Sequence, residues 1–438
     1  MTTKSIKSTK ILFISIIMGL FTFQSCSNSD SLISEENSHV DVLSENLKDI
    51  TASDMETMID ILKESGVDSD MLDNIDIYAS EPSSLRSTPS VMNILVRTMK
   101  VTTKIKHPDG SGKDITVSGV LLVPRISFSP LRILVGSPPT YLNNSEAPTN
   151  MFKSLSLIRD NGEINYLYFF TLQATQGFAV LFPDYPGYGD SYGEGVMPFA
   201  CKEPLVNSTI ELVKATQEIL KKNKYSYKKE LILTGYSLGA YVATSMYQKL
   251  ENDANMPVKL TIAGGSLLDF SAIFDRARSS DTFADPLTFP FVLLAYSKYE
   301  DKSLVIKDML KSPYCDMPYL EKAFDGTNST SKINDMFPSK VSDLFTDIVL
   351  NEFNTNPKLN SIRHLLDKNC IKPWKNKHRI EFIHGVNDNT SYYDITKNFY
   401  EEQKKLGGDV KFTPVIGDHT TAALGYYLYT SVLLLSNK

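Results

Sequence analysis

The sequence predicts an α/β protein with a mostly parallel central sheet, an antiparallel hairpin at its N-terminal side and an inserted helical cap. Three observations lead to this fold class. Two alternating apolar segments flank a turn at residues 107–112, six short apolar runs follow between residues 131 and 417 with helical stretches between them, and one long segment has no buried strand pattern.

The hairpin is predicted from alternation of apolar and polar residues on both sides of one turn. Residues 91–105 (VMNILVRTMKVTTKI) and 115–124 (ITVSGVLLVP) both alternate in this way. Between them lie Pro108, Asp109 and Gly110, which are typical turn residues. These segments therefore form the first two strands.

The six apolar runs are each short, are bounded by Gly or Pro, and are separated by helical patterns. Short buried strands that alternate with helices are typical of a parallel sheet covered on both faces. The runs are LRILVG at 131, FAVLFPDY at 178, ELILTGYS at 230, VKLTIAGG at 258, RIEFIHG at 379 and VKFTPVIG at 410.

Residues 271–377 interrupt this rhythm and contain no clear strand. A structureless loop of this length is improbable, so the sequence predicts a mostly helical cap between the sixth and seventh strands. Its apolar segment PLTFPFVLLAY is expected mainly to form the core of the cap itself, and only secondarily to line a pocket. The sheet domain is then expected in two parts, residues 91–270 and 378–438.

Residues 1–25 have the pattern of an export signal. Lys4, Lys7 and Lys10 precede an apolar run over residues 11–23, which is short for a membrane span. The following Cys26 resembles the lipidated cysteine of bacterial lipoprotein signals. The resemblance implies export to the bacterial cell envelope and a lipid anchor on Cys26, in the outer membrane or facing the periplasm. An ordinary secretory signal with a chance cysteine is the alternative.

Residues 26–90 are rich in Ser, Asp, Glu and Asn, which is typical of a solvated tether. Within this tether, residues 53–66 (SDMETMIDILKESG) predict a short helix. Ser53 and Glu56 form a capping pattern, and apolar residues follow at helical spacing. This helix either packs on the main domain or spaces it from the membrane.

Charge and cysteine content exclude several classes of function. The formal net charge is −6 and no basic stripe is present, so DNA and RNA are excluded as partners. With Cys26 lipidated, Cys201, Cys315 and Cys370 allow at most one disulfide, and no cysteine pair has zinc spacing. No metal or organic cofactor is expected.

Two segments match the pattern G-x-S-x-G of a serine nucleophile, at Ser191 and at Ser237. Ser237 follows a predicted strand and precedes a helical pattern, as a nucleophile elbow requires. Ser191 is followed by Gly193, Gly195 and Pro198, which prevent a regular helix. Ser237 is therefore the predicted nucleophile, and Ser191 with Asp190 is expected to hydrogen-bond local backbone in a turn.

The histidine that activates Ser237 is predicted by its place in the chain. When the serine lies in a nucleophile elbow on such a sheet, the catalytic residues follow one another along the chain in the order serine, acid, histidine, and the histidine comes after the last strand. His419, in GDHTTA, occupies that place. The five others fit less well, because they precede the elbow, lie in or beside the cap, or end a strand: His39, His107, His364, His378 and His384.

The acid is expected directly after the seventh strand. Asp388, in IHGVNDNTSYYD, lies at that strand's exit, whereas Asp394 falls within a predicted helix. Asp269, after the sixth strand, is a second alternative.

The segments GYSLGA, HGVND and GDHTTA resemble the α/β-hydrolase superfamily, in particular its secretory-lipase-like and carboxylesterase members. The resemblance implies an α/β-hydrolase fold and a His-Gly-Thr oxyanion loop after the third strand. Here that segment reads GSPPTYLNNSEAP, in which Thr140 matches the threonine and Pro138 and Pro139 replace the His and Gly. Since proline has no N–H, two other backbone N–H groups are the expected donors. The first is that of Thr140, with Tyr141 as second choice, and the other is that of Leu238, directly after the nucleophile.

Together these features predict a serine hydrolase that cleaves carboxylic esters, such as small esters or lipids, through an acyl-enzyme. The substrate pocket is expected to involve Tyr141, Tyr188, Tyr192 and Tyr236. Two alternatives stay open: a serine exopeptidase of the same fold, and a surface lipoprotein that binds a ligand on an inactive hydrolase scaffold.

Overall fold

The computed structural model describes residues 96–127, 129–152, 170–171, 173–174 and 176–436. The predictions for the signal peptide, for Cys26 and for the helix over residues 53–66 fall outside these described residues.

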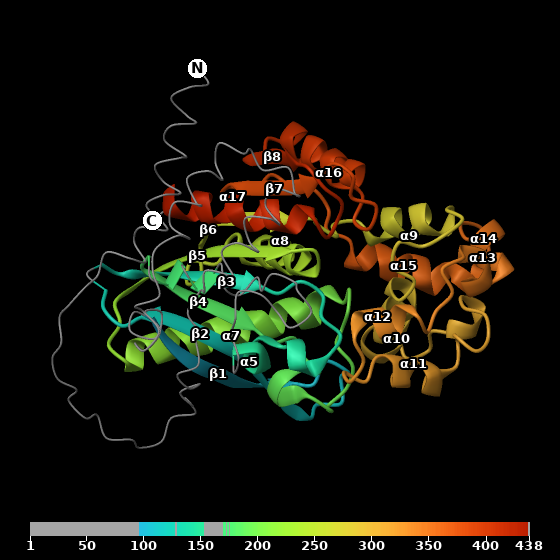
Figure 1. Cartoon of the computed structure of the whole chain (residues 1–438), viewed down its shortest axis with the longest axis horizontal. Coiled ribbons are helices and arrows are strands. Elements are labelled where there is room, and N and C mark those ends of the chain that lie inside the picture. The colour runs from blue at the N-terminus through green and yellow to red at the C-terminus, as the bar shows by residue number, and fades with distance from the viewer. Residues whose placement is uncertain (1–95, 128, 153–169, 172, 175, 437–438) are drawn as a thin grey trace, which may run out of the picture.

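The core of the molecule is one eight-stranded sheet with the order β1-β2-β4-β3-β5-β6-β7-β8 (Figure 1). Strand β2 is antiparallel to β1 and to β4, and all other neighbours are parallel. All eight predicted strands are confirmed. Their bounds are β1 Val96–Lys106, β2 Asp114–Pro124, β3 Leu131–Ser137, β4 Phe178–Pro183, β5 Tyr227–Tyr236, β6 Val258–Gly264, β7 Ile380–Gly385 and β8 Val410–Val415.

The central strands are buried on both faces, which explains their continuous apolar sequences. Alternate residues of β3 enter two separate cores: Ile133 and Val135 pack in the cluster that contains Tyr241, and Leu134 packs in the cluster that contains Tyr426. The first face is covered by α7 (Lys202–Lys222), α8 (Leu238–Leu250) and α16 (Tyr393–Lys405), and the second by α17 (Ala422–Ser436).

A set of short helices lies between β6 and β7, as predicted, and is called the helical insert below. Its members are α9 Phe270–Arg278, α10 Thr288–Tyr299, α11 Met317–Ala323, α12 Thr330–Asn334, α13 Val341–Leu344, α14 Asp347–Glu352 and α15 Asn360–Asn369, with 3-10 turns η4 Ile306–Asp308 and η5 Pro357–Leu359. Elsewhere, the short elements are η1 Asn144–Glu146, α5 Pro148–Met151 and η3 Gly189–Ser191.

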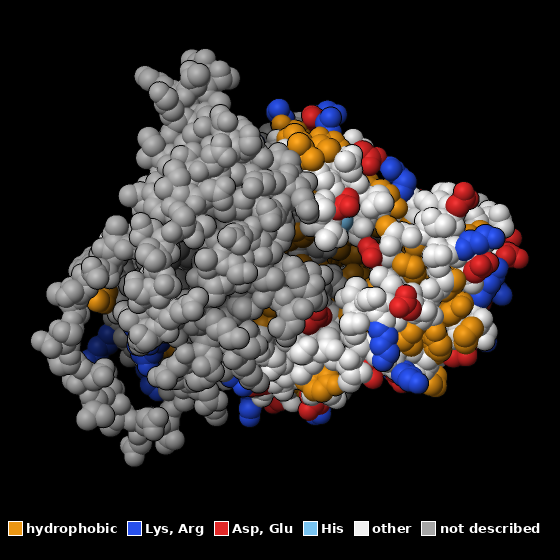
Figure 2. Space-filling model, in the orientation of Figure 1, with side chains coloured by type: hydrophobic (Ala, Val, Ile, Leu, Met, Phe, Trp, Pro, Cys, Tyr) orange, Lys and Arg blue, Asp and Glu red, His pale blue; other side chains and the backbone are white. Residues whose placement is uncertain are grey.

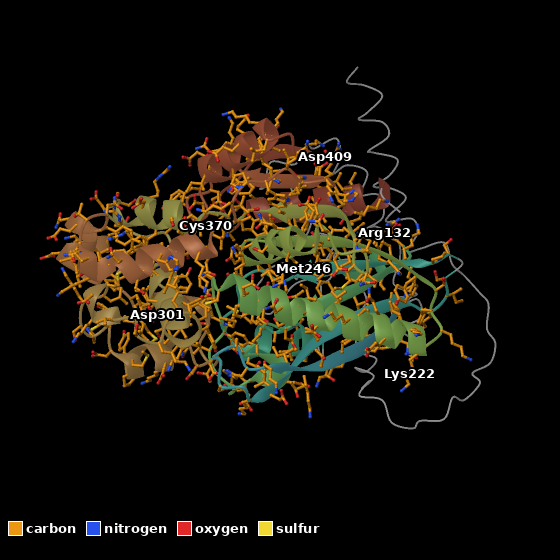
Figure 3. All side chains as sticks on the ribbon, turned by 180° about the vertical axis from the view of Figure 1, so that it is seen from behind. Arg132, Lys222, Met246, Asp301, Cys370 and Asp409 are labelled. Atoms are coloured by element: carbon orange, nitrogen blue, oxygen red, sulfur yellow. The ribbon has the colours of Figure 1, made fainter. Side chains whose placement is uncertain are left out.

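The helical insert lies beyond the carboxyl ends of the strands. Arg132, near the start of β3, and Asp409, just before β8, mark the amino ends of the strands, and Figure 3 shows both at the end of the sheet away from Asp301 and the insert. In α/β folds the loops at the carboxyl ends carry the functional groups. The insert therefore lies on the functional side of the sheet.

The insert has an aromatic core of its own. The ring of Phe291 in α10 stacks on that of Phe324 at 4.3 Å, and Phe274 packs edge-on against Phe289 at 4.9 Å. Phe291 is fully buried. The apolar segment around α10 thus builds the insert itself, as predicted, while Figure 2 shows basic and acidic side chains interspersed over the surface of this part.

Cys201, Cys315 and Cys370 are free thiols. Among the described residues, no helix combines the length and the apolar composition that crossing a membrane requires.

Candidate active site

The chain turns sharply between β5 and α8, and Ser237 occupies the turn. Its backbone has φ 56°, a left-handed value that is unfavourable for a residue with a side chain. The Ser237 N–H donates to the carbonyl of Gly264 at 2.8 Å, which ties the turn to the neighbouring strand. This is the strand, tight turn and helix that the sequence predicts around Ser237.

Two glycines make this turn possible. A Cβ at Gly235 would lie 2.2 Å from the backbone of Gly239, and a Cβ at Gly239 would lie 2.1 Å from the carbonyl oxygen of Ser137. Both glycines of the pattern are thus required by backbone contact rather than by flexibility. The second contact also places the loop after β3 against the first turn of α8.

Replacing Gly239 with alanine is expected to destabilise the fold by about 3 kcal/mol, since backbone must move to admit the methyl group. Urea unfolding measures this loss. Gly425→Ala in α17 is the matched control, because a Cβ there meets Val415 at an ordinary 3.4 Å. Equal stability of the two variants would contradict the close packing inferred at Gly239.

The structure brings Ser237, His419 and Asp388 into one hydrogen-bonded chain. Ser237 Oγ lies 2.9 Å from His419 Nε2, and His419 Nδ1 lies 2.7 Å from Asp388 Oδ2. The three residues come from the end of β5 and from the loops after β7 and β8, so the parallel sheet places them at one edge. An Nδ1–H that donates to the carboxylate leaves Nε2 free to accept the serine proton.

Asp388 is held by donors on both of its oxygens. Oδ1 accepts the N–H groups of Thr390 and Ser391, each at 2.9 Å, and Oδ2 accepts the Ser391 hydroxyl at 2.8 Å besides His419. His384 Nε2 lies 3.1 Å from the same Oδ2. Burial alone would raise the pKa of Asp388, but hydrogen bonds from His384 and His419 outweigh it and hold the pKa well below its ordinary value. The carboxyl is therefore ionised.

His384 and Ser391 were not among the predicted site residues. The sequence interpretation of His384, as a residue that shapes a strand end, accounts for its position at the end of β7 but not for its contact with Asp388. The available signal was the spacing of four residues between His384 and Asp388 across a tight turn.

The aromatic ring of Tyr236 packs against His419, with 5.3 Å between ring centroids. Its hydroxyl donates to the backbone carbonyl of His419 at 2.5 Å. Burial, with the charge of Asp388 adding to it, raises the pKa of Tyr236 well above its ordinary value, so the hydroxyl stays protonated and able to donate. Tyr236 thus holds the histidine loop in place.

Leu238 is the first residue of α8, and the N–H groups of a first helical turn have no acceptor within their own helix. The loop after β3 runs beside this turn, since both Ser137 and Pro138 approach Gly239. Thr140 lies two residues further along this loop. The assignment of Leu238 and Thr140 as oxyanion donors stays a prediction.

Three buried tyrosines brace that loop. The Tyr185 N–H donates to the Tyr141 hydroxyl at 2.8 Å, and the Tyr185 hydroxyl donates to the Pro138 carbonyl at 2.7 Å. The Tyr188 hydroxyl donates to the Leu142 carbonyl at 3.1 Å. Tyr141 and Tyr188 therefore have structural partners of their own.

Tyr192 differs from these residues, since it is 42% exposed and its ring lies against Gly326 of the helical insert. The predicted substrate contacts of Tyr141, Tyr188, Tyr192 and Tyr236 stay predictions.

Comparison with solved structures places this architecture among known folds. A Legionella pneumophila protein of proposed hydrolase activity matches with a TM-score of 0.65 and 18% identity over 81% of this chain and 92% of its own. The rice cell wall degrading esterase LipA of Xanthomonas oryzae matches with a TM-score of 0.64 and 22% identity over 78% and 89%. Candida antarctica lipase A matches with a TM-score of 0.58 and 16% identity over 78% of both chains. The chain has the α/β-hydrolase fold.

No protein-family model and no curated protein matches the sequence. The α/β-hydrolase fold is therefore recognisable here from structure, while the identities are too low to transfer an activity.

Within this α/β-hydrolase fold, the alternative acids have other partners. Asp269 Oδ1 caps α9 by accepting the N–H of Ala272 at 2.9 Å. Asp394 forms an ion pair with Arg276 at 2.6 Å and its side chain is 53% exposed. Asp388 is the one of the three that the structure places against His419.

The alternative serine lies in a turn, as predicted. Ser191 is fully buried, and its hydroxyl donates to the Tyr188 carbonyl at 2.8 Å and accepts the Gly187 N–H at 3.0 Å.

The prediction for Asp190 was wrong, because its carboxylate pairs with Lys100 of β1 at 2.6 Å instead of bonding local backbone. The loop lies over the β1–β2 hairpin, which brings this lysine within reach.

Proposed function

We propose that the chain is a serine hydrolase that cleaves carboxylic esters through an acyl-enzyme intermediate. The observation that carries the proposal is the hydrogen-bonded chain from Ser237 Oγ through His419 to the buried Asp388 carboxylate. A serine hydroxyl is a weak nucleophile until a base accepts its proton, and this geometry supplies the base and a carboxylate that orients it.

In the proposed reaction, Ser237 Oγ attacks the ester carbonyl carbon while its proton passes to His419 Nε2. The negative charge on the carbonyl oxygen is stabilised by the backbone N–H groups of Leu238 and Thr140. His419 then gives the proton to the leaving alcohol, and the acyl group stays on Ser237. Water, activated by His419 in the same way, releases the acid and restores Ser237.

Throughout this cycle the ionised Asp388 keeps Nδ1 protonated and stabilises the imidazolium that forms on His419. The low pKa of Asp388 ensures that it does not compete for the proton. The proposed chemistry uses no metal and no organic cofactor.

An ester or lipid substrate is favoured by the esterase and lipase among the similar structures. The helical insert lies beyond the carboxyl ends of the strands (Figure 3), and the triad residues follow those same ends, so the insert is proposed to set the acyl length that is accepted. The proposed organisation of the chain is a signal (1–25), a tether (26–90), a hydrolase core in two parts (91–270 and 378–438) and a cap (271–377).

The function is tested by initial rates on p-nitrophenyl esters of increasing acyl length, from acetate to palmitate. The proposal predicts hydrolysis, and the preferred length measures how much chain the insert encloses. Hydrolysis of aminoacyl or dipeptidyl p-nitroanilides in place of esters would identify an exopeptidase instead. A folded protein inactive on both substrate classes would support the ligand-binding alternative.

Export and lipid anchoring at Cys26 are also proposed, on the sequence pattern alone. Cys26→Ser is expected to move the protein from the detergent phase to the aqueous phase in Triton X-114 partitioning of bacterial cells, because each buried CH₂ contributes about 0.8 kcal/mol to membrane binding. Cys315→Ser is the control and is expected to partition like the parent. Equal partitioning of parent and Cys26→Ser would contradict the anchor.

A further inference from the structure

His384 reaches the triad from β7. Its side chain is fully buried, and Nε2 lies 3.1 Å from Asp388 Oδ2 and 3.2 Å from Ser391 Oγ. A carboxylate oxygen only accepts, so this contact requires a proton on Nε2 of His384. The triad carboxylate therefore faces two imidazole N–H groups, one from His384 and one from His419.

Ser391 connects the two histidines. Its hydroxyl donates to Asp388 Oδ2 at 2.8 Å, and its oxygen lies 3.2 Å from His384 Nε2 and 3.3 Å from His419 Nδ1. Since the single hydroxyl proton is used on Asp388, the oxygen presents its lone pairs to both imidazoles. Oδ2 thus has a donor on three sides, and the carboxylate cannot rotate without breaking several hydrogen bonds.

A purely structural role does not explain a histidine at this position. Within the described part of the chain, His384 Nδ1 is buried and has no hydrogen-bond partner. A buried acceptor left unpaired costs stability, and an apolar side chain would avoid this cost. The Nε2–H donated to Asp388 is the contact that an apolar side chain would lose.

We propose that His384 and Ser391 are positioning residues of the active site, which fix Asp388 Oδ2 and share its negative charge so that His419 Nδ1 meets one well-defined acceptor. This inference rests on the proposed function, since it concerns the acid of the same triad. His384 and Ser391 act through Asp388 and do not touch the substrate.

The other ionisable groups around Asp388 come from three further segments. Tyr236, at the end of β5, and Tyr392, before α16, both interact electrostatically with Asp388, and so does Asp418, beside His419. Burial raises the pKa of both tyrosines, so they stay neutral. The pKa of Asp418 is lowered by hydrogen bonds from Thr421, so Asp418 keeps its negative charge.

Three substitutions at His384 separate positioning from packing. Gln places an amide N–H near the position of Nε2, Asn is too short to reach Asp388, and Leu has similar volume but no donor. We expect kcat to fall about 10- to 100-fold in His384→Leu and His384→Asn, with little change in KM. In His384→Gln we expect most of the parent kcat to be restored. The kcat of Ser391→Ala is expected to fall by a similar factor.

The pH profile gives a second readout. Loss of a donor makes the Asp388 carboxylate a stronger acceptor for the N–H of its remaining imidazole partner, so the acid limb of kcat/KM is expected to move to higher pH in His384→Leu and Ser391→Ala. His384→Gln is expected to keep the limb of the parent. Thermal melts establish that each variant is folded. If His384→Leu does not fold, the comparison of His384→Gln with His384→Asn, together with Ser391→Ala, tests the inference.

A spectroscopic readout distinguishes failure of this inference from failure of the proposed function. The proton between His419 Nδ1 and Asp388 is expected to give a low-field proton NMR resonance, which shifts or broadens in His384→Leu and is restored in His384→Gln. This signal does not depend on turnover. The inference would be overturned if folded His384→Leu and His384→Asn variants had the kcat, the acid limb and the resonance of the parent. Absence of any ester turnover in the parent would overturn the proposed function alone.

Discussion

Ser237→Ala is expected to reduce ester turnover by about 10⁴- to 10⁶-fold, because the variant has no atom to form the acyl-enzyme. Initial rates on the preferred p-nitrophenyl ester measure the loss. The residual rate is expected to exceed that in water, since the proposed oxyanion donors remain.

The matched control is Ser191→Ala, which removes the serine of the second G-x-S-x-G pattern. Ser191 is buried and bonded to its own turn, so this variant is expected to lose some stability and to keep most of its activity. Activity lost in Ser191→Ala and kept in Ser237→Ala would reverse the assignment of the nucleophile.

Asp388→Asn is expected to lower kcat by about 10⁴-fold. The amide can turn its NH₂ toward His419 Nδ1, which then has to accept, so that Nε2 carries the proton and cannot take one from Ser237. The rate is measured on the same ester, and a thermal melt verifies that the variant is folded.

Asp394→Asn and Asp269→Asn are controls for this prediction. The first removes an exposed ion pair with Arg276 and the second a helix cap, so neither is expected to change kcat by more than a few fold. Full activity in Asp388→Asn together with a large loss in Asp269→Asn would move the acid to the end of β6.

The strands and the elbow could be predicted because their signals are local. Each strand is a continuous or alternating apolar run, and the turn at Ser237 requires glycines at fixed offsets, because a Cβ at Gly235 or Gly239 would lie within 2.2 Å of neighbouring backbone. The proximity of Asp388 and His419 to Ser237 could be predicted because each lies in the loop that follows a parallel strand, and the carboxyl ends of parallel strands meet at one edge.

The contacts of His384, Ser391 and Asp190 could not be predicted in the same way. Their partners depend on how separate loops meet in space: Ser391 lies between histidines of two different segments, and Asp190 pairs with Lys100 across the hairpin. Periodicity also says little about the insert, where α12 and α13 are too short to show an amphipathic repeat.

Covalent labelling with a fluorophosphonate tests whether Ser237 is an activated nucleophile. We expect one phosphonyl adduct, located by peptide mass spectrometry on Ser237 and absent from the folded Ser237→Ala variant. A folded parent protein that takes up no label, or that carries it on Ser191, would show that Ser237 is not an activated nucleophile.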